Sequence, residues 1–458
     1  MKTSTCNISI SATDYECLME HLFPGDGDEH GAVLKAGVVI DGDQLRLVVR
    51  DIALAKEGSD YVKGKIGHRA LHPTFIHRQI TSCRDQKLAY LAVHNHGSDD
   101  YVAFSRVDME SHERGYPALL DIARGVPIGG LVFGRRSVEA DIWLPNGGRL
   151  ALNEFRVIGS AVARLRSSPD RYGSADHEFD RQVRMFGEAG QAVLNASKIA
   201  VVGLGGIGSL IAEYLGRLGV GNIILIDPDV IEDTNLSRVV GATHQDVMHS
   251  MRKIDIAKRH LSEANTRARV TLIFNDVAKS SVAAQLRQCD FIFLAADSMR
   301  ARLVVNALVH QYLIPAIQVG AKIRISENGS LEDAMSAVRQ LRPGYGCLWC
   351  NQLIDPTQLA IEAKTDEERK AQAYGTQQPN PSVITMNAVA AGHAVNDFLF
   401  DFLGLRAMNN KVDYQHFHFT NRKAQIVHPR KDEHCRECGK VDGRYGMGDA
   451  ASLPCLDD

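Results

Sequence analysis

Four cysteines fall into two Cys-x-x-Cys pairs that lie far apart in the chain. They are Cys347, Cys350, Cys435 and Cys438. A tetrahedral zinc ion takes four thiolate ligands, and two turns of this kind supply them. Because such a closed site has no open coordination position, we predict a structural zinc ion that stabilises the fold. A redox pair or a chance pairing is the alternative.

A second candidate metal site begins with two histidines, His94 and His96. Residues two apart at the end of a strand point in the same direction. With Asp108 they would provide three ligands and leave one position on a zinc ion for water. A zinc ion lowers the pKa of bound water, and a nearby carboxylate can then take the proton. Glu29 is our candidate for that base, so this zinc would be catalytic.

A glycine-rich loop lies between an apolar strand and an amphipathic helix. Glycines allow a tight turn, and the N-terminus of a helix offers free N–H groups to phosphate oxygens. Asp227 ends the next strand and is placed to bond ribose hydroxyls. The loop alone is equally compatible with an NAD-dependent dehydrogenase. Its candidate cofactor-binding residues are Gly203, Gly205, Gly206, Gly208 and Ser209.

Polar residues further along the chain favour a different chemistry. They are Asn235, Arg238, Lys253 and Asp297. An enzyme that transfers a hydride needs no such series of polar and charged residues around the phosphates. Adenylyl transfer does, because charge gathers on the α-phosphate as a carboxylate attacks it, and an acidic residue is needed to hold magnesium. Arg238, Lys253 and Asp297 are therefore predicted to be catalytic in the transfer of AMP from ATP, and Asn235 to bind the cofactor.

The elements that must position these residues alternate regularly in the second half of the chain. A buried strand followed by a helix, repeated several times, predicts a parallel sheet with crossover helices. Strands are expected at 198–204, 222–229, 269–277 and 290–297, and helices at 207–219, 254–265 and 281–289. The first 165 residues are expected to mix both types, with strands at 45–55, 87–96, 128–134 and 138–145 and a helix at 111–125.

The second half resembles the superfamily of ThiF, MoeB and ubiquitin-activating enzymes. The resemblance covers about residues 178–440 and opens with the sequence FDRQ at 179–182. It implies a Rossmann-like, doubly wound domain with a structural zinc ion that activates the C-terminus of a ubiquitin-like or sulfur-carrier protein. In homodimeric relatives the opening arginine reaches the ATP of the partner subunit. Arg181 therefore implies a homodimer.

The same resemblance assigns roles to individual side chains. Asp227 should bind the ribose, and Asp297 should coordinate Mg²⁺. Asn235, Arg238 and Lys253 should surround the phosphates of ATP. The stretch between Arg238 and Lys253 is longer than is usual in the family.

The first half, over about residues 5–160, resembles the JAB/MPN (JAMM) metalloisopeptidases. The order of Glu29, the His-x-His pair, Ser105 and Asp108 carries the resemblance. It implies that Ser105 helps to stabilise the oxyanion when a zinc-bound water attacks a peptide or isopeptide bond. The alternative is a domain of this fold without metal that serves as a binding platform.

These patterns predict the domain organisation. An α/β domain of JAB/MPN type at 1–165 and a linker at 166–178 precede the ThiF-type domain at 179–445, and a flexible tail follows at 446–458. The chain has 458 residues and a formal net charge of −3, which gives no reason to expect nucleic acid or a membrane as partner. Its N-terminus has no apolar segment typical of a signal peptide, so we expect a cytoplasmic protein.

The chain as a whole is predicted to be bifunctional. One domain would process or deconjugate a ubiquitin-like protein, and the other would adenylate the carboxylate at the C-terminus of such a protein. Residues 351–384 contain no cysteine, so a thioester cannot form on the loop where activating enzymes commonly carry it. The reaction would then either stop at the adenylate or pass it directly to a thiol of another protein of conjugating type. The alternatives are sulfur-carrier activation in cofactor biosynthesis, or a fusion in which one inactive domain only recruits its partner.

Overall fold

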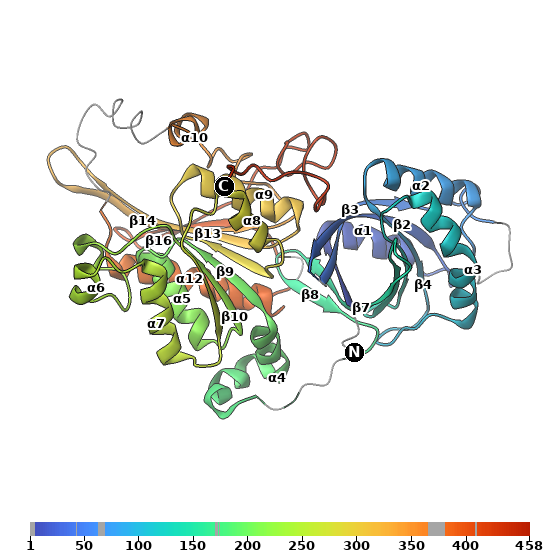
Figure 1. Cartoon of the computed structure of the whole chain (residues 1–458), viewed down its shortest axis with the longest axis horizontal. Helices are drawn as coiled ribbons and strands as arrows, with labels where there is room; N and C mark the ends of the chain where they lie inside the picture. The colour runs from blue at the N-terminus through green and yellow to red at the C-terminus, as the bar shows by residue number, and fades with distance from the viewer. Residues whose placement is uncertain are drawn as a thin grey trace. The chain divides into compact units, whose positions relative to one another are not determined.

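The chain folds into two compact units, and each is composed of segments that are separated in sequence (Figure 1). The computed structural model describes residues 5–42, 44–62, 69–169, 173, 175–364, 381–407 and 410–458. Unit 1 comprises residues 1–171, 310–313 and 438–452. Unit 2 comprises residues 172–309, 314–437 and 453–458.

Unit 1 is built on a sheet of eight strands in the order β1-β3-β2-β4-β5-β6-β7-β8, and β1 also pairs with β7. This extra pairing curls the sheet back on itself. The strands are β1 (Thr5–Ser11), β2 (Gly31–Asp41), β3 (Gln44–Leu54), β4 (Ala89–Asn95), β5 (Ile128–Phe133), β6 (Val138–Trp143), β7 (Arg149–Ile158) and β8 (Val162–Leu165). The helices are α1 (Ala12–Leu22), α2 (Pro73–Asp85) and α3 (Arg106–Ala123).

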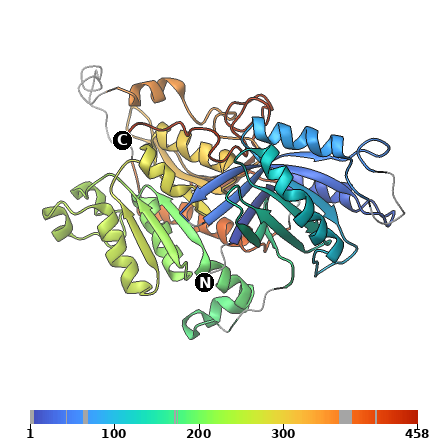
Figure 2. The same cartoon turned by 45° about the vertical axis from the view of Figure 1, so that its right-hand side comes forward.

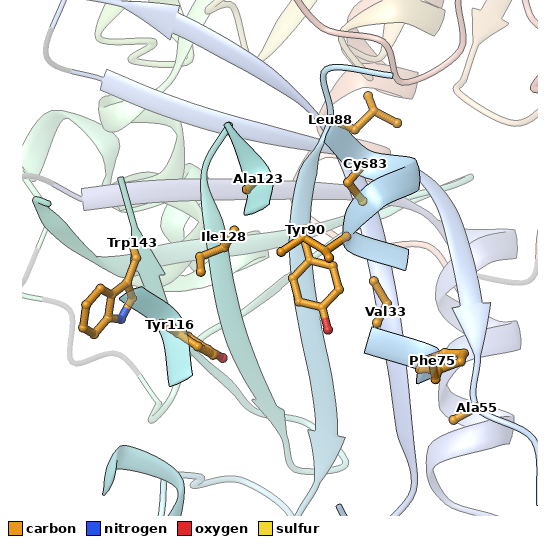
Figure 3. Close-up of a cluster of buried hydrophobic side chains, with 11 residues drawn as sticks. Val33, Ala55, Phe75, Cys83, Leu88, Tyr90, Tyr116, Ala123, Ile128 and Trp143 are labelled. Atoms are coloured by element: carbon orange, nitrogen blue, oxygen red, sulfur yellow. The ribbon is translucent and has the colours of Figure 1, made fainter. Parts of the chain in front are cut away.

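A hydrophobic core forms where α2 and α3 cover the central strands of unit 1 (Figure 3). Tyr90 of β4 and Ile128 of β5 contribute from the sheet, and Phe75 of α2 and Tyr116 of α3 contribute from the helices. All four are at least nine-tenths buried. This packing fixes the start of α3 and the end of β4, which carry the predicted metal ligands.

The C-terminal part of the chain completes unit 1. Arg50 of β3 donates hydrogen bonds to the carbonyl oxygens of Lys440, Gly443 and Tyr445. The fully buried Tyr445 donates its hydroxyl proton to Asp14 over 3.0 Å. Since residues 438–452 belong to unit 1, this unit extends beyond the predicted boundary at 165. The prediction missed it because these contacts join residues at opposite ends of the sequence.

Unit 2 also contains an eight-stranded sheet, in the order β11-β10-β9-β12-β13-β14-β15-β16. The first five strands in this order are parallel, as the alternating pattern predicts, and the last three are antiparallel. The strands are β9 (Lys198–Val202), β10 (Asn222–Ile226), β11 (Arg269–Ile273), β12 (Phe291–Leu294), β13 (Ala316–Ile325), β14 (Leu331–Leu341), β15 (Tyr414–His418) and β16 (Lys423–Val427).

Helices cover both faces of the parallel part of this sheet. Helices α5, α7 and α12 pack together on one face, and α8 and α9 lie on the other (Figures 1 and 2). This arrangement follows from right-handed strand–helix–strand connections and is a doubly wound α/β fold. The longer helices are α4 (Asp180–Ala196), α5 (Gly206–Arg217), α7 (Lys253–Ala264), α9 (Met299–Gln311) and α12 (Ile384–Phe402). The shorter ones are η1 (His177–Phe179), η2 (Asp233–Asn235), α6 (His244–Met248), α8 (Ser280–Leu286) and α10 (Pro356–Glu362).

The last residues of the chain are bound to unit 2. The Leu456 N–H donates to the Ala278 carbonyl over 2.7 Å, and the Asp458 carboxylate accepts hydrogen bonds from Ser280 and Ser281. The sequence predicts a flexible tail at 446–458, whereas in the structure the end of this segment is hydrogen-bonded to unit 2. In the predicted linker, residues 170–172 and 174 lie outside the described residues, as do residues 365–380 of the cysteine-free segment.

Candidate active sites

The glycine-rich loop joins β9 to α5 with a geometry that side chains would block. Gly203 has a φ of +90°, and a Cβ atom on it would lie 2.7 Å from the Ala296 nitrogen. A Cβ on Gly208 would lie 1.8 Å from the Gly203 carbonyl oxygen. Gly205 is the N-cap residue of α5 and has open space beside it. The space beside Gly205 lies at the N-terminus of α5, where the first N–H groups of a helix can bind a phosphate group.

Asp227 follows β10 and is bound to the backbone of this loop. Its carboxylate accepts hydrogen bonds from Leu204 N at 2.6 Å and from Asp229 N at 2.9 Å. Burial raises the pKa of Asp227, while the charge of Lys253 and these two N–H groups act in the opposite direction. Lys253 forms an ion pair with Asp229, with its Nζ atom 2.7 Å from the carboxylate. The residues predicted to bind the ribose and the phosphates thus lie close together.

Arg238 and Asn235 lie in the segment that follows β10 through η2. The Asn235 side chain is buried and accepts from the Glu232 N–H at 3.3 Å. Arg238 donates to the Thr234 carbonyl at 2.6 Å. A Cβ added to Gly206 would lie 3.3 Å from the Arg238 Cβ, so Arg238 passes beside the start of α5.

Near this loop, Ser209 has a different role from the predicted one, and Asn387 was not predicted to lie there. The hydroxyl of Ser209, predicted to bind the cofactor, is buried and accepts from the Val240 N–H at 3.1 Å. That bond ties α5 to the segment after Arg238. Asn387 of α12 is buried, and a Cβ on Gly206 would meet its amide nitrogen at 2.2 Å. No sequence motif singles out Asn387, because it reaches the loop from a helix far along the chain.

Asp297 and Arg181 are the two exposed members of the predicted nucleotide site. Asp297 follows β12, and β12 pairs in parallel with β9, which the glycine loop follows. The Asp297 carboxylate is therefore at the same edge of the sheet as the loop. Arg181 is exposed in the first turn of α4. Its neighbour Gln182 donates to Gln191 and to the Leu218 carbonyl, which anchors α4.

The four predicted zinc-binding cysteines come together. The sulfur atoms of all four lie within 4.8 Å of one another. The sulfur of Cys347 is 3.5 Å from that of Cys350 and 3.8 Å from that of Cys435. Zinc–sulfur bonds of about 2.3 Å give a tetrahedral edge of about 3.8 Å. The cluster therefore fits a zinc ion and is too wide for a disulfide.

In unit 1, the end of β4 and the start of α3 bring the three other predicted ligands together. The Nε2 atoms of His94 and His96 are 3.2 Å apart, and each lies 3.6 Å from a carboxylate oxygen of Asp108. Zinc bonds of about 2.0–2.1 Å to nitrogen and oxygen give tetrahedral edges of about 3.3–3.4 Å. The donor atoms therefore have the separations that one zinc ion requires.

The first turn of α3 holds Asp108 in place. Ser105 is the N-cap residue: its hydroxyl accepts from Asp108 N at 3.2 Å, and the Asp108 carboxylate accepts from Ser105 N at 2.8 Å. Burial opposes ionisation of Asp108, but hydrogen bonds from His94 and Ser105 hold its pKa below the usual value. Burial and the neighbouring His94 lower the pKa of His96, which favours the neutral ring that binds metals.

Glu29, the predicted base, lies at the edge of this cluster. Its carboxylate is 3.9 Å from the Nε2 atom of His96. The next residue, His30, donates its backbone N–H to the side-chain oxygen of Asn95 over 2.6 Å. Asn95 thereby fixes the loop that carries Glu29. Sequence reasoning missed this role, although Asn95 stands between the two histidine ligands.

Comparison with known proteins identifies the second unit. Residues 179–438 match the ThiF family. This match covers more than half of the 458 residues, so the chain belongs to the ThiF family. The match begins where the FDRQ sequence begins and includes every predicted nucleotide ligand and all four clustered cysteines.

Individual relatives share only parts of their length with this chain. The sulfur carrier protein ThiS adenylyltransferase of Bacillus subtilis (strain 168) is 35% identical over 120 residues, which cover 26% of this chain and 36% of the relative. The molybdopterin-synthase adenylyltransferase of Escherichia coli (strain K12) is 30% identical over 149 residues, covering 32% and 59%. A crystal structure of E. coli MccB with MccA-N7isoASN has a TM-score of 0.48 and 21% identity, and covers 58% of this chain and 76% of that one.

The family match starts after residues 1–171, the N-terminal segment of unit 1. The resemblance of residues 5–160 to the JAB/MPN metalloisopeptidases therefore remains a prediction that rests on the residues of unit 1 themselves. Within the ranges that the structure describes, no helix combines the length and the apolar character needed to span a membrane.

Proposed function

We propose that unit 2 adenylates the C-terminal carboxylate of a sulfur-carrier or ubiquitin-like protein, with ATP and Mg²⁺. The main support for this proposal is that, in a chain of the ThiF family, Asp227 binds the backbone of the glycine loop, Arg238 passes beside the start of α5, and Asp297 follows β12 at the same edge of the sheet. The relatives of this chain include the sulfur carrier protein ThiS adenylyltransferase and the molybdopterin-synthase adenylyltransferase.

The proposed reaction uses these residues mainly for charge stabilisation. An oxygen of the substrate carboxylate attacks the α-phosphorus of ATP, the bond from that phosphorus to the bridging oxygen breaks, and pyrophosphate leaves. The N–H groups of α5, with Arg238 and Lys253, would bind the negative charge that gathers on the phosphates. Asp297 would hold Mg²⁺, which neutralises phosphate oxygens. Arg181 is exposed and so available to the ATP site of a second subunit in a homodimer.

An isotope-exchange assay tests this function. Purified protein with a carrier protein, ATP and labelled pyrophosphate should form labelled ATP, because adenylation is reversible. Asp297→Ala and Arg238→Ala should each reduce the exchange at least about a hundredfold. Arg217→Ala is a matched control, since this arginine of α5 is 63% exposed and its one ion pair among the described residues is with Glu213. Undiminished exchange in both site variants would disprove the assigned site.

The relatives favour sulfur-carrier activation over protein conjugation. The names of the first two curated relatives reported above refer to sulfur-carrier or molybdopterin chemistry. The absence of cysteine from residues 351–384 agrees with an adenylate that is passed directly to a thiol on another protein. We therefore place the carrier protein first among the proposed partners, in the cytoplasm, and a conjugating-type thiol protein second.

A specific observation supports a second function for unit 1. The separations of His94, His96 and Asp108 fit a zinc ion, and Glu29 lies beside them. We propose that this unit hydrolyses a peptide or isopeptide bond at the end of the same carrier protein. The three ligands would hold zinc, which supplies an activated water, and Glu29 would take the proton of that water. Glu29→Gln should abolish hydrolysis of a carrier fusion while the zinc content stays unchanged. Undiminished hydrolysis by this variant would disprove the role of Glu29, and a wild-type protein that does not hydrolyse the fusion would make unit 1 a binding platform.

A further inference from the structure

Asn387 places a side-chain amide against the first turn of α5, beside the glycine-rich loop. It lies near the start of α12 and is 2% exposed. A Cβ atom on Gly206, the first residue of α5, would lie 2.2 Å from the Asn387 Nδ2 atom and 3.3 Å from the Cβ of Arg238. The amide nitrogen, the start of α5 and Arg238 therefore meet at one point, and glycine at position 206 leaves room for all three.

The packing of α12 against α5 brings this amide to the loop. Asn387 is near the start of α12 and Gly206 is at the start of α5, so both helices begin at the edge of the sheet where the loop leaves β9. Asp297 follows β12 at the same edge. Asn387 therefore lies in the region where the phosphates of ATP would bind in the proposed reaction.

The hydrogen bonding of the amide leaves part of its capacity for a ligand. Its Nδ2 atom donates to the hydroxyl of the exposed Ser382 over 3.1 Å, and this is the one hydrogen bond of the side-chain amide among the described residues. An amide nitrogen carries two N–H groups, and burying a polar group costs free energy unless it is hydrogen-bonded. The second N–H belongs to the atom that lies against Gly206, at the end of a helix where phosphate oxygens accept hydrogen bonds.

We propose that Asn387 is a further nucleotide-binding residue, whose amide donates a hydrogen bond to a phosphate oxygen of ATP. The inference rests on the proposed use of ATP by unit 2. Arg238 would supply positive charge on the same side of α5, whereas the amide would add a neutral, directional donor beside the backbone N–H groups of the helix. A donor fixed by burial needs no rearrangement when the phosphate binds.

Titration with ATP distinguishes this role from a purely structural one, in which Asn387 only holds Ser382. N387A removes both bonds and should weaken ATP binding about tenfold or more, as expected for a hydrogen bond to a charged group. N387D keeps the shape of the side chain and can accept a hydrogen bond from the Ser382 hydroxyl, but its negative charge would repel the phosphates. N387D should therefore bind ATP more weakly than N387A.

A matched variant controls for the added charge. Asn396 lies on the same helix and is exposed, so N396D should bind ATP like the wild type. Unfolding temperatures without ATP show whether each variant is folded, and N387A decides alone if N387D is not. Wild-type affinity in N387A, or binding by folded N387D that is as tight as that of N387A or tighter, would overturn the inference. Pyrophosphate exchange by the wild type tests adenylation separately: ATP binding without exchange would disprove the proposed function and leave this inference standing.

Discussion

The two candidate sites are built in different ways. In unit 2 the nucleotide site depends on backbone: glycines at Gly203 and Gly208 let a loop pass where any Cβ would collide, and α5 presents its N–H groups. In unit 1 the metal cluster depends on side chains, with His94, His96 and Asp108 converging from a strand end and a helix start.

This difference determines how each site can be recognised and how it should fail. A site made of backbone depends on a long stretch of sequence, and here that stretch lies within the ThiF family match at residues 179–438. A site made of three side chains needs only a few residues and is recognised by its geometry. Changes at the first site that place a side chain where the loop leaves no room should disturb folding and ligand binding together. Changes at the second should remove the ligand and leave the fold intact.

Glycine substitutions give the largest expected effect. Gly208→Ala should destabilise unit 2 by about 3 kcal/mol or more, because its Cβ would lie 1.8 Å from the Gly203 carbonyl oxygen. Gly205→Ala is the matched variant, since its Cβ would meet open space. It should unfold at the same temperature as the wild type and bind ATP more weakly. Thermal unfolding with and without ATP measures both, and equal stability of the two variants would contradict the described loop.

Zinc content provides the next test. The wild-type protein should contain two zinc ions per chain by elemental analysis, one for each cluster. His96→Ala should lose one ion and keep its unfolding temperature. Cys435→Ser should lose the other ion and unfold at a lower temperature, because closed thiolate sites stabilise folds. A single zinc ion that His96→Ala does not remove would make unit 1 a metal-free platform.

The ion pair between the buried Asp246 and the exposed Arg259, near the nucleotide residues, should give the smallest effect. Arg259 donates to both carboxylate oxygens of Asp246, at 2.7 and 2.9 Å, and these bonds hold the pKa of Asp246 below its usual 3.8. A carboxylate with a lowered folded-state pKa adds stability above its usual pKa and loses it as pH falls through the folded-state value. Asp246→Asn should therefore cost about 1–2 kcal/mol at pH 7 and less below pH 4 in urea unfolding. A pH-independent cost would refute this.

The sequence predicts the parallel part of unit 2 well, because apolar strands and amphipathic helices alternate there with little interruption. The predicted strand at 198–204 corresponds to β9, and the predicted helix at 207–219 corresponds to α5. The convergence of the four cysteines also follows from their spacing, since two such turns suit one tetrahedral ion.

Long-range packing explains what the sequence could not predict. Tyr445 and Asp14 lie at opposite ends of the sequence, and the residues around each of them do not predict their hydrogen bond. Asn387 reaches the glycine loop from α12 in the same way.

Mass spectrometry of a carrier protein incubated with this protein, ATP and Mg²⁺ tests the central claim most directly. The account predicts AMP attached to the C-terminal carboxylate of the carrier, and no such adduct when the carrier ends in an amide or when the protein carries Asp297→Ala. AMP on any other group of the carrier, or turnover of ATP without any adenylate when no thiol acceptor is present, would contradict it.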